Sequence, residues 1–191
     1  KMTKNLLSSA VFAGLIAGLI AALLQFVFVI PLLLEGELYE SGARVHFATD
    51  GSTQSDRAQP ALGNDFARHG MTVAFNMVTY TGYGLILLAL MVLAPGKGYA
   101  LTPRTGLIWG VAGFLAVQLA PGIGQPPVLP GAIGSEVGPR QAWWAFTIIC
   151  TAIALALIAF GKGWSSLLSI PLLLAPHIIG APYLDTYYGV A

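Results

Sequence analysis

Three carboxylates and one imidazole gather in a short stretch that could bind a metal ion. Glu35, Glu37 and Glu40 follow the spacing E-x-E-x-x-E, and His46 comes a little further along the chain. Carboxylate oxygens and imidazole nitrogens are ligands that divalent cations accept in proteins. The same residues are also typical of a solvated anionic segment at a helix end, because their spacing matches no sharp ligand motif. The pattern leaves both interpretations open.

A second group of polar residues falls within apolar stretches. His177, Asn76 and Gln118 each lie in a run that is otherwise largely apolar, and an ionisable residue inside a membrane span is by default a functional candidate. At about 1.5 Å per residue, all three fall in the outer halves of their predicted spans. They either form a pocket or path with Pro121, or hydrogen-bond the carbonyls that Pro121 and Pro176 release.

The composition indicates the class of protein that must position these residues. Hydrophobic residues make up 56% of the 191-residue chain and charged residues 9%, against roughly 25% charged residues in soluble domains. Long charge-free runs favour an all-α polytopic membrane protein, whose first partner is the lipid bilayer. A β-barrel would instead show segments of about ten alternating residues. No basic stripe with interleaved aromatic residues indicates binding to nucleic acid.

Apolar stretches predict five transmembrane helices in one membrane domain that covers residues 1–191. The predicted spans are about 6–34, 69–93, 105–120, 141–160 and 164–181. The first run is too long for the apolar core of a signal peptide, which is about 7–15 residues, so we expect a retained span with a kink near Pro31. Within it, small residues recur every four positions and favour close helix packing. This small-residue face consists of Ala10, Gly14, Gly18 and Ala22.

Two segments outside the spans have distinct compositions. Residues 35–68 form a predicted outer loop that carries most of the acidic residues, and residues 121–140 form a predicted outer segment rich in Pro and Gly. The stretch QLAPGIGQPPVLPG at 118–131 contains four prolines, so it cannot be one continuous helix. Non-helical backbone near membrane depth requires protein or water to satisfy its carbonyls. We therefore expect a capping or lining loop packed by neighbouring helices.

The distribution of charge predicts the orientation in the membrane. With five spans, one side receives five basic residues and no acidic residue, whereas the other side receives all eight acidic residues and four arginines. Under the positive-inside rule, the amino terminus is cytoplasmic and the carboxyl terminus lies outside. The basic residues on the predicted cytoplasmic side are Lys1, Lys4, Lys97, Arg104 and Lys162.

Signatures of catalysis are missing from the sequence. It contains no H-E-x-x-H, no phosphate-binding P-loop, no G-x-S-x-G and no pair of acidic residues within a span. These motifs supply the metal, nucleotide or nucleophile in common enzyme classes. We therefore expect no enzymatic activity, and no bound group other than a transported divalent cation. Active transport would have to draw energy from another subunit or from an ion gradient.

Three motifs resemble one known family over most of the chain. LAPGIGQPPVLPG at 119–131, RQAWW at 140–144 and PHIIGAP at 176–182, with the acidic loop after the first span, are similar to the CbtA family. That family is described as a predicted cobalt transporter subunit, usually found alongside a small one-span partner, CbtB. Many members carry a histidine-rich tract in the first outer loop, whereas this chain has only His46 there.

The resemblance implies a subunit of the bacterial cytoplasmic (inner) membrane that transports cobalt or another divalent cation. Glu35, Glu37, Glu40 and His46 would gather cations outside, and His177 would mark the entry path with Gln118 and Asn76. The alternative is a non-catalytic accessory subunit that stabilises a larger membrane complex. Short loops, small-residue faces and an incomplete ligand set favour that alternative.

The predicted orientation can be tested by cysteine accessibility. A Cys placed at Ser52 should react with a membrane-impermeant reagent added from outside, because residues 35–68 are predicted to lie there. A Cys placed at Lys97 should not react under the same conditions. The reverse labelling pattern would show that the orientation is wrong.

Overall fold

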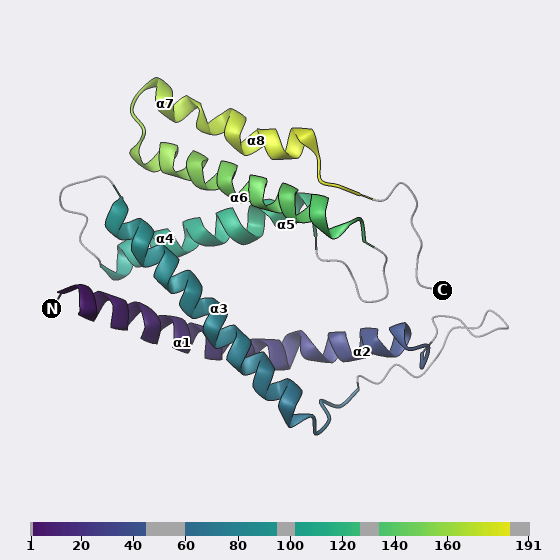
Figure 1. The fold of residues 1–191 in the computed structure, drawn as a ribbon. Coiled ribbons are helices and arrows are strands. Elements are labelled where there is room, and N and C mark those ends of the chain that lie inside the picture. Colours follow the sequence, from purple (N-terminus) through teal and green to yellow (C-terminus); the bar gives the residue numbers. More distant parts are fainter. Residues whose placement is uncertain (1, 45–59, 95–101, 127–133, 184–191) are drawn as a thin grey trace. The chain divides into compact units, whose positions relative to one another are not determined.

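The described part of the chain is helical. The computed structural model describes residues 2–44, 60–94, 102–126 and 134–183, and it contains no β-strand within these ranges. The helices fall into two compact units, with α1–α3 in the first and α4–α8 in the second. Their bounds are α1 Met2–Phe28, α2 Ile30–Glu40, α3 Phe66–Leu93, α4 Pro103–Phe114, the π-helix η1 Leu115–Leu119, α5 Ala120–Gly124, α6 Val137–Phe160, α7 Trp164–Leu167 and α8 Ser169–Ile179 (Figure 1).

Four stretches of described helix are long and apolar enough to cross a bilayer. They are Lys4–Phe28, Phe66–Leu93, Pro103–Gly124 and Val137–Phe160. Large apolar side chains on these helices are exposed, among them Leu23, Val78 and Ile149, as expected where lipid is the solvent. The prediction of an all-α membrane protein is confirmed. The predicted fifth span corresponds to a shorter apolar helix, Trp164–Ile179, so the count of five stays a prediction.

The first predicted span is interrupted and then continues as a second helix. Pro31 lies in the first turn of α2, where it lacks a backbone N–H and its ring would clash with a carbonyl one turn earlier. The helix is therefore interrupted locally at Val29, while the N–H of Val29 still donates to the Gln25 carbonyl and the N–H of Leu33 to the Val29 carbonyl. Since α2 runs on to residue 40, Glu35, Glu37 and Glu40 lie on a helix, whereas the sequence predicted a loop from residue 35. Glutamate and leucine, which fill this stretch, both favour helix.

Glycines bring α1 and α3 into backbone contact in the first unit. A Cβ added at Gly14 would meet the backbone of Thr81, and one added at Gly18 would meet the backbone of Met77. Because residue numbers rise along α1 as they fall along α3, the two helices run antiparallel. This contact confirms that the small-residue face packs within the chain, as small residues permit in membranes.

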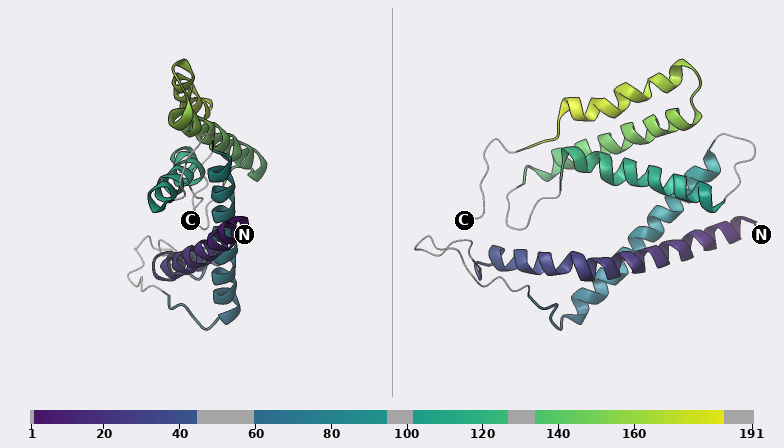
Figure 2. Two further views of the ribbon diagram at one scale, coloured as in Figure 1. Left: turned by 90° about the vertical axis from the view of Figure 1, so that its left-hand side faces the viewer. Right: turned by 180° about the vertical axis from the view of Figure 1, so that it is seen from behind.

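In the second unit, α8 lies along α6 (Figure 2). The turn through α7 reverses the chain, so the two helices run antiparallel. Small or weakly polar side chains are buried on both helices and permit close approach. These small or weakly polar buried residues are Thr147, Cys150, Thr151 and Ala154 on α6, and Ser169 and Pro176 on α8; the larger Trp143 of α6 is also buried.

The third predicted span continues past its predicted end at residue 120. The segments α4, η1 and α5 form one helical run to Gly124, and Pro121 is buried inside it. The N–H of Ala120 donates to the carbonyl of Leu115, five residues earlier. This wider π-turn offers room where the proline ring would otherwise press on the preceding turn.

The non-helical part of the Pro/Gly-rich segment is shorter than the predicted segment, residues 121–140. The helix that contains Pro121 ends at Gly124, and α6 already begins at Val137, where the sequence predicted a start at residue 141. Gln125 and Pro126 are not helical. Residues 127–133 lie outside the described residues, so the predicted order of that part stays a prediction.

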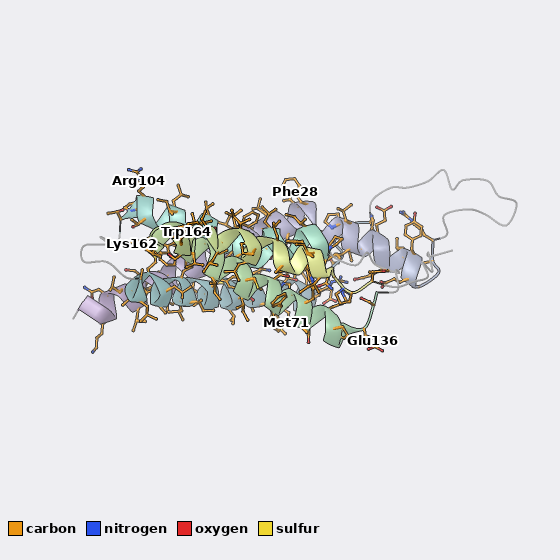
Figure 3. The ribbon with its side chains drawn as sticks, turned by 90° about the horizontal axis from the view of Figure 1, so that it is seen from above. Phe28, Met71, Arg104, Glu136, Lys162 and Trp164 are labelled. Carbon is orange, nitrogen blue, oxygen red and sulfur yellow. The ribbon has the colours of Figure 1, made fainter. Side chains whose placement is uncertain are left out.

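Charged residues separate along the second unit. Arg104 and Lys162 lie at one end of this unit, and Glu136 lies at the other end (Figure 3). The separation follows from the reversal of direction between α4 and α6, which returns the chain to the end where α4 began. It agrees with the charge pattern used to predict the orientation. The orientation of the chain in the membrane stays a prediction.

The backbone contact between α1 and α3 can be tested with single alanines. Gly18→Ala should destabilise the protein by about 1–3 kcal/mol, the usual cost of overpacking a tight contact, because its Cβ would meet backbone that cannot move aside. Gly82→Ala on α3 is the matched control, since a Cβ there meets nothing within 4 Å. Thermal unfolding in detergent measures both variants, and equal melting temperatures would contradict the contact.

Candidate functional site

Two of the three predicted acidic ligands are paired with arginines. Glu35 Oε1 lies 3.3 Å from Arg44 Nη1, just beyond the end of α2. Glu37 accepts two hydrogen bonds from the guanidinium of Arg68, one of them at 3.0 Å, which joins α2 to the start of α3. Such fork-to-fork pairing is the most directional that a carboxylate and an arginine can make. The two pairs tie Arg44, just after α2, and Arg68, at the start of α3, to α2.

Arg68 lowers the pKa of Glu37 below its ordinary value. The main cause is the side-chain hydrogen bond from Arg68. Desolvation is the next largest effect and opposes it, and a weaker attraction between the charges adds to the lowering. The pair therefore stabilises the fold above the ordinary carboxyl pKa of 4.5, and this contribution is lost as pH falls through the lowered pKa. Both side chains are more than a third exposed, so the contribution is small, roughly 0–1 kcal/mol.

The described residues do not assemble a preformed metal site. Within residues 2–44, 60–94, 102–126 and 134–183, no three His, Cys, Asp or Glu side chains gather as they would around a metal ion. His46 lies outside the described residues, and Glu40 takes part in a further interaction. Binding of a cation by Glu35, Glu37, Glu40 and His46 therefore stays a prediction.

Asn76 pairs with a residue that the sequence did not single out. Its Nδ2 donates to Gln25 Oε1 at 3.0 Å and to the Thr72 carbonyl at 2.9 Å. Both partners belong to the first unit, and the bond between the two amides links α1 to α3. The signal was present, because Gln25 is a polar amide deep in a long apolar run. Polar side chains in such runs tend to hydrogen-bond across helices.

His69 lies about two turns before Asn76 along α3. Its ring contacts Phe26 of α1 edge-on, with 5.4 Å between ring centroids, and its Nε2 lies 3.3 Å from the Gly63 carbonyl. Nδ1 is buried and has no hydrogen-bond partner among the described residues. The first unit thus carries an amide pair and an imidazole between α1 and α3. The sequence predicted only that His69 begins a span.

His177 belongs to a cluster in the second unit. Its ring contacts Trp143 edge-on, with 5.9 Å between centroids. A Cβ added at Gly124 would meet the Trp143 ring and would lie 3.5 Å from His177 Nδ1. Trp143 Nε1 donates to the Pro176 carbonyl at 2.9 Å in a buried bond. This carbonyl also accepts from the N–H of Gly180 at 3.0 Å, so α5, α6 and α8 meet around Trp143.

The predicted pocket is reproduced only in part. The start of the Pro/Gly-rich segment does lie beside His177, through Gly124, and Pro121 is buried one turn earlier. Gln118 is exposed on the π-helix. Asn76 belongs to the first unit and makes its bonds there, so a path that joins Asn76 to His177 stays a prediction. Trp143 is the donor that the sequence did not identify.

Comparison with known proteins gives one family match. The model of the CbtA family, described as "Probable cobalt transporter subunit (CbtA)", matches residues 3–189. No curated protein and no solved structure matches the chain. The match covers both units, including the acidic end of α2, the Pro/Gly-rich segment and the cluster around Trp143.

The bond from Trp143 to Pro176 predicts different effects at two adjacent tryptophans. Trp143→Phe removes the donor and part of a buried ring, and should destabilise the protein by about 1–3 kcal/mol. Trp144→Phe is the matched control, because the Trp144 side chain is 43% exposed, and its change should stay within about 0.5 kcal/mol. Thermal unfolding compares the two variants. Equal losses would mean that the Trp143 bond contributes nothing specific.

Proposed function

Because the chain belongs to the CbtA family, we propose that it is an integral membrane subunit for the uptake of cobalt or another divalent cation. The family match over residues 3–189 carries this proposal. The four membrane-length helices support it, since a transport subunit has to cross the bilayer. The proposed location is the cytoplasmic (inner) membrane of a bacterium, with the amino terminus in the cytoplasm.

The acidic end of α2 is the proposed collecting surface for cations. Glu35, Glu37 and Glu40 lie on the last turns of α2, and His46 follows in sequence. A carboxylate has about four lone-pair sites, so pairing with Arg44 or Arg68 leaves acceptor capacity for a cation. The arginines also reduce the net negative charge, and this favours weak and reversible binding. A collecting surface has to release its cation, so weak binding suits this role.

The proposed inner path uses the polar residues within the helices. His177 lies on α8 beside Gly124, and Gln25, His69 and Asn76 lie between α1 and α3. Imidazole nitrogens and amide oxygens can replace part of the hydration shell of a divalent cation. His69 is the proposed nitrogen ligand within the first unit, and His177 is the one within the second unit. In this proposal Gln118 and Pro121 belong to the lining around His177.

The proposed partners follow from what the sequence lacks. It contains no ATP-binding motif, so energy for uptake has to come from another subunit or from an ion gradient. A small one-span protein of the CbtB type is the proposed partner. Since α3 has no fully buried residue, its surface is available to lipid or to such a partner helix.

The exposed apolar surface also supports a second candidate function. Phe66, Phe75 and Val78 of α3 are each more than 60% exposed, and a larger assembly could cover them. In that case the chain is a non-catalytic accessory subunit of a membrane complex. Native purification followed by mass spectrometry separates the two functions. A CbtB-like partner supports transport, and a large respiratory or oxygenase complex supports the accessory role.

The collecting surface can be tested by removing its charge. Combined Glu35→Gln, Glu37→Gln and Glu40→Gln should lower cobalt uptake by about two- to fivefold in cells that depend on this protein. That decrease corresponds to a loss of roughly 0.5–1 kcal/mol of attraction. Uptake of radioactive cobalt is the measurement, normalised to the amount of protein in the membrane.

Arg68→Gln is the matched control for this experiment. It breaks the same ion pair with Glu37 but keeps the carboxylate, so uptake should stay the same or rise. If Arg68→Gln lowers uptake as much as the glutamine triple variant, the ion pairs matter for the fold and the carboxylates do not collect cations.

A further inference from the structure

A hollow of about 180 Å³ opens at the start of α6 in the second unit. One wall is the chain just beyond α5, and the other is a single face of α6, whose lining residues recur at three- and four-residue spacing. The lining residues are Gln125, Val137, Arg140, Gln141 and Trp144. The hollow is therefore built by two elements of the same unit that meet near the Trp143 cluster.

The side chain of Gln125 brings an unused donor to this hollow. Its Nε2 is buried and has no hydrogen-bond partner among the described residues. The backbone holds the residue in place, because the N–H of Gln125 donates to the Pro121 carbonyl at 2.8 Å. A buried amide nitrogen without an acceptor costs free energy. Because this nitrogen has almost no exposed surface, it can donate to a ligand oxygen in the hollow only after the Gln125 side chain turns, and that bond would remove the cost.

Arg140 gives the hollow a positive charge. The ion pairs given by the described residues join Glu35 to Arg44 and Glu37 to Arg68, and neither involves Arg140. Glu136 lies one turn earlier and is exposed, and the residues that line the hollow include no carboxylate. The amino-terminal end of α6 adds a partial positive charge. The site thus combines positive charge with hydrogen-bond donors, as an anion site requires.

We propose that this hollow binds a phosphate group, carried by a phospholipid headgroup or present as free phosphate. A guanidinium binds phosphate oxygens in a bidentate manner, and the Gln125 amide supplies a further donor once its side chain turns toward the hollow. The hollow lies at the beginning of the candidate span Val137–Phe160, where headgroups and interfacial tryptophans such as Trp144 are found. Val137 and Trp144 offer an apolar wall for the glycerol of a lipid. The position of the hollow at the start of a candidate span and its apolar wall both favour a phospholipid over free phosphate.

The proposal is tested by phosphate and lipid binding to the purified full chain. Delipidated protein in detergent is titrated with phosphatidylglycerol by native mass spectrometry, and separately with inorganic phosphate by ³¹P NMR. Arg140→Gln should weaken phosphatidylglycerol binding roughly tenfold, because a charge-assisted bond is lost. Arg140→Lys keeps the charge but loses the bidentate geometry, so its affinity should be intermediate.

Arg104→Gln is the matched control, since Arg104 lies at the opposite end of the same unit from Glu136 (Figure 3). Its affinity for phosphatidylglycerol should stay within about twofold of the unmodified chain. Binding of the lipid but not of inorganic phosphate identifies a headgroup site, and binding of both identifies a general phosphate site. The proposal is overturned if neither binds, or if Arg140→Gln and Arg104→Gln weaken binding equally. Thermal unfolding of each variant confirms that it is folded.

Discussion

Every helix of this protein that lies in lipid has to satisfy its own backbone hydrogen bonds, and prolines make this difficult. Three prolines illustrate different solutions. At Pro31 one helical hydrogen bond is lost, and the chain continues as α2 after a local interruption at Val29. At Pro121 a π-turn widens the helix and lets it continue to Gly124. At Pro176 the helix also continues, and its carbonyl is bonded to Trp143 of the neighbouring helix. The other two prolines flank the cluster around His177: Pro176 precedes it in the chain, and Pro121 lies one turn before Gly124, which is beside the His177 ring.

The arginines beside the acidic residues of α2 reduce the negative charge at that end of the helix. Without them, Glu35 and Glu37 would form a strongly negative surface next to the membrane. With Arg44 and Arg68 bound to them, the same residues become a set of exchangeable ion pairs. A cation arriving there competes with guanidinium groups rather than filling an empty site. Such competition makes cation binding dependent on ionic strength, since exposed ion pairs are screened by salt.

Much of the fold could be predicted from sequence, because the length of apolar runs and the spacing of glycines are local signals. Four spans and the close packing at Gly14 and Gly18 follow from them. The prediction was wrong where local signals conflict. Acidic residues suggested a loop at residue 35, but the helix propensity of leucine and glutamate extends α2. Proline suggested an end at residue 120, but packing and the π-turn keep the helix intact.

The candidate site was less predictable, because it depends on contacts between residues distant in the sequence. Gln25 was recognisable as an isolated amide, yet its pairing with Asn76 requires the register between α1 and α3. The donor to the Pro176 carbonyl is an aromatic residue, Trp143, which the sequence marked only as part of the motif RQAWW at 140–144. Arg140 and Gln125 line one hollow only because the end of the helical run through Pro121 packs against α6.

The backbone contact between α1 and α3 also bears on how the protein enters the membrane during its synthesis. Both helices belong to the first 93 residues, and Gly14 and Gly18 meet Thr81 and Met77 without help from later helices. The hairpin can therefore pair while the ribosome is still making the second unit, since amino-terminal parts fold first during synthesis. Pairing of the two helices would also keep the amide side chains of Gln25 and Asn76 away from lipid tails. In this protein, the glycines of the first helix thus serve both the packing of the finished fold and the early pairing of α1 with α3 during membrane insertion.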